Sequence, residues 1–288
     1  MKIYILPVPK KLQPAAQVFK YPRHNKDYGV EQDFYHYLLI NRDLTVENPR
    51  LADWHYLPVF WTRWHLNHLY GKICLAELQQ EMDQAILDDA KTFTICQYDD
   101  GPLVNPGRAS VFLASRKSEE GIDIPLLCSP HQAPPVKPQK RYLASFVGRL
   151  ATHGIRQQMA QVLKDREDVF VFDGNLGSGF FVEKLQESYI GLCPRGYGGS
   201  SFRFFETMQL GAVPFLIGDL DTRPFKRFID WDGMSLYTNS VADLHAILDS
   251  MKPAELVEMG EWAGSFWENE LTYQRWCKYV LKELVSLK

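Results

Sequence analysis

The chain has 288 residues, of which 45% are hydrophobic and 13% aromatic, enough for one large or two ordinary folded domains, and this composition excludes a disordered chain. Its formal net charge of −3 gives no general electrostatic reason to bind nucleic acid or an anionic membrane surface. Any anion-binding site must therefore be local.

The sequence contains neither a typical membrane segment nor a typical cysteine metal site. The apolar run at residues 1–7 is too short for a signal peptide, and no stretch approaches the ~20 apolar residues of a membrane span. The five cysteines are odd in number and far apart, which indicates reduced, buried thiols rather than a disulfide framework or a zinc site.

The first half of the chain predicts buried strands at 1–6 and 54–60 and a helix at about 31–40. Another apolar run, 92–96, leads into Asp99 and Asp100. A loop at a strand end can aim these two carboxylates at a ligand. Asp-Asp-Gly-Pro is also a good turn sequence, so a purely structural role for the pair stays open.

A proline-rich stretch at 130–138 predicts an extended linker between two domains, 1–133 and 139–264. Beyond it, short apolar runs alternate with helical patterns. The strands are expected at 142–147, 169–172, 188–194 and 213–217, and the helices at about 155–164 and 181–186. This alternation predicts a parallel sheet covered on both faces, with ligands at the carboxyl ends of its strands. The region 262–287 is predicted to be helical.

The most informative segment is Ser188 to Glu206, a buried strand followed by a glycine-rich turn and a helix. Ser200, Ser201 and Arg203 open that helix, whose unpaired N–H groups and dipole favour a phosphate. Arg203 adds a donor for phosphate oxygens, and Glu206 lies one turn further on, where a ribose fits. The plain alternative is a serine N-cap and an ordinary Arg203–Glu206 ion pair.

Other loops should reach the same edge of the sheet. Arg149 and Arg156 flank the loop after the first strand of the second half, and Asp173 follows the second strand. Arg156 is a candidate phosphate ligand, with a solvated helix charge as its alternative.

The segment resembles the signature of the exostosin family of glycosyltransferases. The matching elements are Cys193-Pro194, Ser201-Phe-Arg203-Phe-Phe-Glu206, Gly211-Ala-Val-Pro214, Pro224-Phe225 and Ile229-Asp-Trp231, and weaker similarity reaches back to residue 2. The resemblance implies an α/β GT-B fold, two Rossmann-like domains facing across a cleft. It also implies that a terminal helix, 265–288, packs back on the first domain.

The resemblance further implies an inverting transfer of sugar from a UDP-sugar, with UDP-xylose among the compatible donors, to a glycan hydroxyl. The donor-binding set expected from it is Arg149, Arg156, Asp173, Arg195, Gly199, Ser200, Ser201, Arg203 and Glu206. The UDP-sugar is a co-substrate, and no separate cofactor is expected.

The catalytic base should come from the first half of the chain. Asp99 and Asp100 are the first choice and Glu31 the second. The family often has an Asp-His pair near this point, which is absent here. Two Asp-x-Asp triplets, Asp219 to Asp221 and Asp230 to Asp232, invite a metal site, but we expect a metal-independent enzyme because arginines already supply positive charge.

Two alternatives remain. A non-catalytic nucleotide-sugar or glycan-binding protein would keep the donor site and lack the base. A nicotinamide-dependent oxidoreductase fits the alternating pattern but lacks Gly-x-Gly-x-x-Gly after an early strand. The lack of an anchor favours a cytoplasmic protein of a bacterium or virus, and the oligomeric state stays open.

Overall fold

The computed structural model describes residues 1–18, 29–132, 136 and 138–288. The chain divides into two compact units, which are described separately below. The first unit contains Met1–Leu127 and Tyr273–Lys288, and the second contains Cys128–Thr272. The boundaries between the units lie at 127/128 and 272/273. The boundaries predicted from the sequence were 133–139 and 264/265, which is some residues away in each case.

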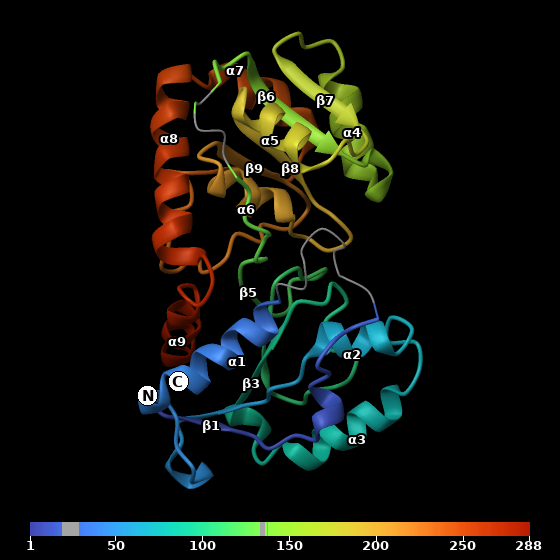
Figure 1. Cartoon of the computed structure of the whole chain (residues 1–288), viewed down its shortest axis with the longest axis vertical. Helices are drawn as coiled ribbons and strands as arrows, with labels where there is room; N and C mark the ends of the chain where they lie inside the picture. The colour runs from blue at the N-terminus through green and yellow to red at the C-terminus, as the bar shows by residue number, and fades with distance from the viewer. Residues whose placement is uncertain (19–28, 133–135, 137) are drawn as a thin grey trace. The chain divides into compact units, whose positions relative to one another are not determined.

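The first unit is built on a parallel sheet whose strand order follows the chain, β1-β2-β3-β4-β5 (Figure 1). The strands are β1 (Ile3–Ile5), β2 (Trp54–Tyr56), β3 (Thr92–Cys96), β4 (Ser110–Leu113) and β5 (Ile122–Asp123). The expected strand 54–60 ends early at Tyr56, because Pro58 has no N–H to donate to a neighbouring strand. The strands β4 and β5 were not predicted.

Helices cover this sheet on both faces. They are α1 (Val30–Ile40), α2 (Trp61–Asn67), α3 (Leu75–Ala85) and α9 (Cys277–Ser286). Phe34 of α1 packs edge-on against Tyr56 and Phe93, whereas Trp61 and Leu78 join the cluster formed with α2 and α3.

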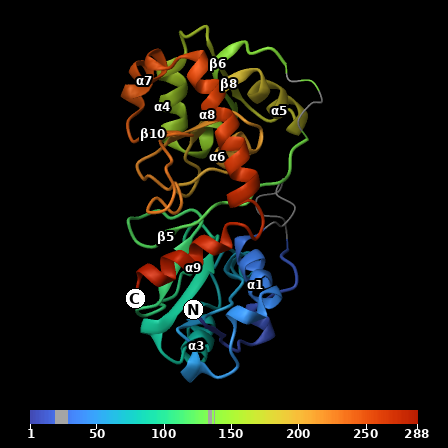
Figure 2. The same cartoon turned by 90° about the vertical axis from the view of Figure 1, so that its left-hand side faces the viewer.

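The predicted helical region 262–287 is interrupted. The helix α8 (Pro253–Phe266) runs into a π-helical turn (Trp267–Leu271), and α9 begins only at Cys277. Asp33 fixes the break, because its carboxylate accepts hydrogen bonds from Gln274 N at 2.6 Å and Trp276 Nε1 at 2.7 Å. The end of the chain therefore packs beside α1 (Figure 2).

The second unit has a parallel sheet in the order β10-β9-β8-β6-β7. Its strands are β6 (Tyr142–Gly148), β7 (Val169–Asp173), β8 (Ser188–Pro194), β9 (Val213–Ile217) and β10 (Leu236–Thr238). Its helices are α4 (Gly154–Leu163), α5 (Ser178–Gln186), α6 (Phe202–Gln209), α7 (Leu244–Ser250) and α8. The direction of strand addition reverses between β6 and β8, so α4 and α6 pack on opposite faces.

The core of this unit explains why its short apolar runs are strands. Phe146, Leu192 and Phe215 lie on neighbouring strands and are fully buried with Met159 of α4. On the other face, Gly191 leaves room for Thr207 of α6, because a Cβ at position 191 would lie 2.3 Å from the threonine hydroxyl.

The two parallel sheets with their covering helices confirm the predicted class, a GT-B type α/β chain with two Rossmann-like units. Among the described residues, no helix is both long and apolar enough to cross a membrane.

Candidate active site

The reversal between β6 and β8 places two helix starts at one point of the second sheet. The helix α4 follows β6 and α6 follows β8, and both begin at the carboxyl edge. Ligands of open parallel sheets bind at such a switch point. The sheet topology therefore singles out the residues that open α4 and α6, among them Arg156 and Arg203.

Arg203 lies across the end of β6. Its Nε donates to the carbonyl of Val147 at 2.8 Å, and its guanidinium lies 4.7 Å from the centre of the Phe146 ring. Gly148 makes this path possible, because a Cβ there would lie 2.0 Å from Arg203 Nη2. Burial lowers the pKa of Arg203.

Arg156 approaches the same ring from α4. Its guanidinium lies 5.8 Å from the centre of Phe146 and donates to three backbone carbonyls, those of Arg195 at 2.9 Å, Arg149 at 3.1 Å and Pro194 at 3.4 Å. Burial, and then the nearby charge of Arg203, lower the pKa of Arg156 to about 10.

Neither guanidinium forms an ion pair with a carboxylate within the described part of the chain. Arg156, which is buried, and Arg203, which is half-buried, thus hold two positive charges near the same ring, and each donates to backbone carbonyls. The charge of Glu206 acts on Arg203 without forming an ion pair. An arrangement of this kind is unfavourable alone and favourable when an anion binds between the charges. The plain alternative, an Arg203–Glu206 ion pair, is not formed.

The glycine turn and the start of α6 add backbone donors next to this pair. Ser201 is the N-cap residue, but its side chain forms no capping hydrogen bond. Ser200 and Ser201 are both buried. Gly196 N donates to Ser200 O at 3.2 Å, and the Gly199 carbonyl accepts from Thr222 Oγ1 at 3.2 Å.

Arg195 differs from Arg156 and Arg203 because its side chain is paired with a carboxylate. It is buried, its Nε donates to Gly198 O at 3.2 Å, and its Nη1 forms an ion pair with Asp219. Its contacts shape the glycine turn and neutralise Asp219 at the end of β9.

Two predicted donor-binding residues are exposed. The Arg149 side chain lies on the surface, and its carbonyl serves Arg156. Asp173 is also exposed, and its Oδ1 accepts from Leu150 N at 2.9 Å, which joins the ends of β6 and β7.

Glu206 is buried one turn after Arg203, and its Oε1 lies 3.0 Å from His131 Nε2. His131, which lies in the proline-rich stretch, was not among the predicted site residues. His153 was missed as well. It is the N-cap of α4, and burial, followed by the charge of Arg195, lowers its pKa. A histidine directly before the glycine that starts a helix was the available signal.

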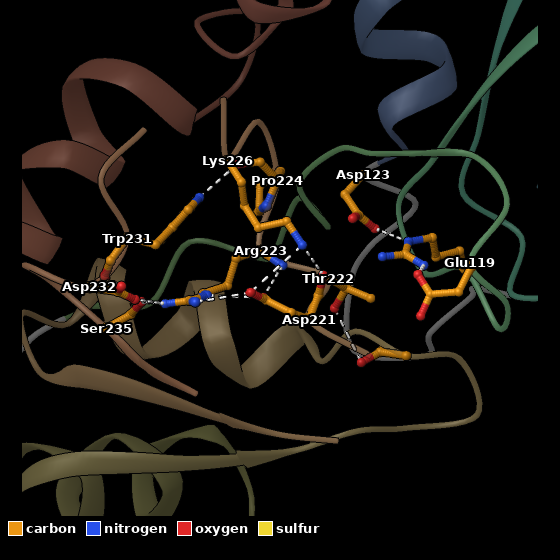
Figure 3. A network of polar contacts seen from close by, with 12 residues as sticks. Glu119, Asp123, Asp221, Thr222, Arg223, Pro224, Lys226, Trp231, Asp232 and Ser235 are labelled. Carbon is orange, nitrogen blue, oxygen red and sulfur yellow. Dashed lines mark hydrogen bonds and ion pairs between the residues drawn. The ribbon is translucent and has the colours of Figure 1, made fainter. Parts of the chain in front are cut away.

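Asp221 and Asp232, one carboxylate from each Asp-x-Asp triplet, bind Arg223 (Figure 3). Asp221 accepts from Arg223 Nε at 3.0 Å and from its Nη2 at 2.9 Å, and Asp232 accepts from its Nη1 at 2.8 Å. Arg223 is buried and also contacts Ser235. These carboxylates therefore stabilise the loop between β9 and β10.

The three candidate bases lie around the end of β3 in the first unit. Glu31 is fully buried, and it accepts from Gln97 N at 2.9 Å and from the backbone and hydroxyl of Thr62. Burial raises its pKa to about 7. Asp99 is half-buried, and Asp100 is exposed in an ion pair with Lys117. The structure brings these carboxylates to one edge of the sheet.

Comparison with known proteins adds independent information. Exostosin-1 of Drosophila melanogaster is 28% identical over 123 residues, 35% of this chain and only 16% of that protein. A probable glucuronosyltransferase of Oryza sativa subsp. japonica is 24% identical over 299 residues, 87% of this chain and 68% of its own length. Among solved structures, AviGT4, a glycosyltransferase involved in avilamycin A biosynthesis, covers 99% of this chain and 97% of its own, with a TM-score of 0.43 and 11% identity.

A family model supplies the most direct assignment. The Exostosin GT47 domain matches residues 102–251, just over half of the chain, including the glycine turn, Arg203 and Glu206. The chain belongs to the exostosin family of glycosyltransferases.

Proposed function

We propose that this protein is an inverting glycosyltransferase that moves a sugar from a UDP-sugar to a glycan hydroxyl. The observation that carries the proposal is the pair Arg156 and Arg203 at the switch point of the second sheet, where Arg156 is buried and Arg203 half-buried. Among the described residues, neither guanidinium forms an ion pair with a carboxylate. A nucleoside diphosphate has the charge that such a pair requires.

The chemistry follows from that placement. The acceptor oxygen attacks the anomeric carbon while the bond from this carbon to the diphosphate breaks, and a base takes the acceptor proton. Negative charge develops on the departing diphosphate, and Arg156, Arg203 and the N–H groups that open α6 stabilise it. These groups supply positive charge without a metal ion or a further cofactor, so we propose metal-independent transfer.

The base is proposed among the carboxylates of the first unit. Asp99 and Asp100 are accessible and can meet an acceptor directly. Glu31 has a pKa suited to proton transfer near neutrality, but it is fully buried and fully hydrogen-bonded by Thr62 and Gln97. We therefore place Asp99 and Asp100 ahead of Glu31.

The donor is proposed to be a UDP-sugar, with UDP-xylose and UDP-glucuronic acid as the first compounds to test. The rice relative's description as a probable glucuronosyltransferase supports the second. Incubation with a panel of UDP-sugars and oligosaccharide acceptors, followed by mass spectrometry, should yield a glycosylated product and UDP, with EDTA having no effect. Loss of transfer in EDTA with recovery in manganese would overturn metal independence, and UDP binding without turnover would identify a binding protein instead.

A further inference from the structure

The first residues of the second unit, 128–132, are hydrogen-bonded to α6. The backbone N–H of His131 donates to Gln209 Oε1 at 2.6 Å, and Gln209 Nε2 donates to the Ser129 carbonyl at 3.5 Å. This is the beginning of the stretch that the sequence marks as an extended linker. At residues 128–132 it is instead held on the helix of the proposed donor site.

The His131 side chain reaches the same helix at Glu206. Its Nε2 lies 3.0 Å from Glu206 Oε1, and the two side chains are only 9% and 8% exposed. The imidazole is also flanked by Phe181, with ring centres 5.5 Å apart. A bond from a ring N–H to a buried carboxylate is charge-assisted and suffers little competition from water.

The bond constrains a side chain that is otherwise flexible. A glutamate side chain loses rotamer freedom when it is fixed, which opposes ligand binding. A glutamate that His131 already holds has lost part of this freedom before its ligand arrives, so binding a hydroxyl pair costs less. Glu206 follows Arg203 by one turn, roughly 4.5 Å along the helix axis, which suits a ribose beside a phosphate.

We propose that His131 is a positioning residue that orients Glu206 toward the ribose hydroxyls of the donor nucleotide. This inference rests on the proposed function, because it requires a nucleoside diphosphate at Arg156 and Arg203. It assigns to the linker segment a role in selecting ribonucleotides. A histidine that merely fixed the segment would affect every nucleotide equally.

The test compares calorimetric affinities for UDP and for 2′,3′-dideoxy-UDP, which lacks both ribose hydroxyls. The wild-type protein should bind UDP about tenfold more tightly than the dideoxy compound. His131→Ala should reduce this ratio to about twofold, mainly by weakening UDP. His131→Gln, which keeps an N–H donor of similar reach, should retain most of the ratio. Phe181→Leu, which removes the ring contact and leaves the His131–Glu206 bond, should preserve it.

Either of two results would contradict the inference. If the wild-type protein bound UDP and 2′,3′-dideoxy-UDP with nearly equal affinity, Glu206 would not bind the ribose hydroxyls. An unchanged ratio in a folded His131→Ala variant, which includes an equal loss for both nucleotides, would reduce His131 to a structural role. These outcomes differ from failure of the proposed function, in which the wild-type protein would bind neither nucleotide. Thermal melting of each variant shows that it is folded.

Discussion

The two sheets of this molecule share a strand number and a parallel direction, yet they differ in strand order and in charge. In the first unit the strands follow chain order, and carboxylates collect around the end of β3. In the second unit the order reverses between β6 and β8, and there the guanidinium groups of Arg156 and Arg203 both lie near the Phe146 ring. A reversal in strand order therefore brings together the N-terminal ends of helices from opposite faces of the sheet, and with them their charged side chains.

The difference also separates two chemical tasks. The second edge offers positive charge and backbone donors, the groups that in the proposed function would stabilise a departing diphosphate. The first edge offers carboxylates, one of which has its pKa raised toward neutrality by burial. A transferase requires both kinds of edge, and each can be disturbed separately.

The largest effect is expected from the arginines. Arg203→Ala should weaken UDP binding by about 100-fold or more, near 2.7 kcal/mol, because a charge-assisted contact to the diphosphate is lost. Calorimetry checks this. Arg141→Ala is the matched control, since Arg141 lies at the opposite end of β6 and is paired with Glu187. If the Arg203 and Arg141 variants bound UDP with equal affinity, the positive charge at the carboxyl edge of the second sheet would have no special role in binding UDP.

The next effect concerns stability of the first unit. Folded Glu31 keeps a proton up to about pH 7, whereas the unfolded chain releases it near pH 4.5. The unfolded state therefore binds fewer protons in this window, and the free energy of unfolding should fall by about 3 kcal/mol as pH rises from 4.5 to 7. Urea denaturation at pH 5 and 7.5 measures this slope.

Glu31→Gln should remove most of this slope, while the exposed Glu47→Gln should leave it intact. Parallel pH dependence in the wild-type protein and the Glu31 variant would mean that Glu31 ionises normally.

A smaller effect is expected at Gly148. Gly148→Ala places a methyl group 2.0 Å from Arg203 Nη2, so the guanidinium must move and UDP affinity should fall about tenfold. Gly154→Ala, where a Cβ meets nothing within 4 Å, should have little effect. Comparable affinities in the two variants would show that the path of Arg203 over β6 is unimportant.

The smallest effect is expected at Thr222. Thr222→Val removes the hydroxyl that donates to Gly199 O and should weaken UDP binding by about threefold to fivefold through a less fixed glycine turn. Thr222→Ser should restore affinity. A valine variant with wild-type affinity would show that the turn is positioned without this bond.

Much of the second unit could be predicted from its sequence, because its strands are short apolar runs separated by clear helical patterns. The strand β10 and the helix α7 of the second unit were not predicted. The strands β4 and β5 of the first unit were not predicted either. The β5 strand has only two residues, Ile122 and Asp123, and its pairing with β4 depends on tertiary context rather than local pattern.

The site was predictable only in part. Arg156 and Arg203 stand in recognisable positions at helix starts, and the structure brings them together on Phe146. The partner of Glu206 was not predictable, because His131 lies 75 residues away in a proline-rich stretch. Contacts of this kind depend on how a connecting segment packs, which leaves no periodic signal in the sequence.

In the proposed function, a nucleoside diphosphate binds between Arg156 and Arg203. Calorimetric titration of UDP and of uridine into the wild-type protein and the Arg156→Ala, Arg203→Ala double variant tests it most directly. The wild-type protein should bind UDP much more tightly than uridine, and the double variant should bind UDP no more tightly than uridine. Wild-type affinity for UDP in the double variant would show that the diphosphate binds elsewhere.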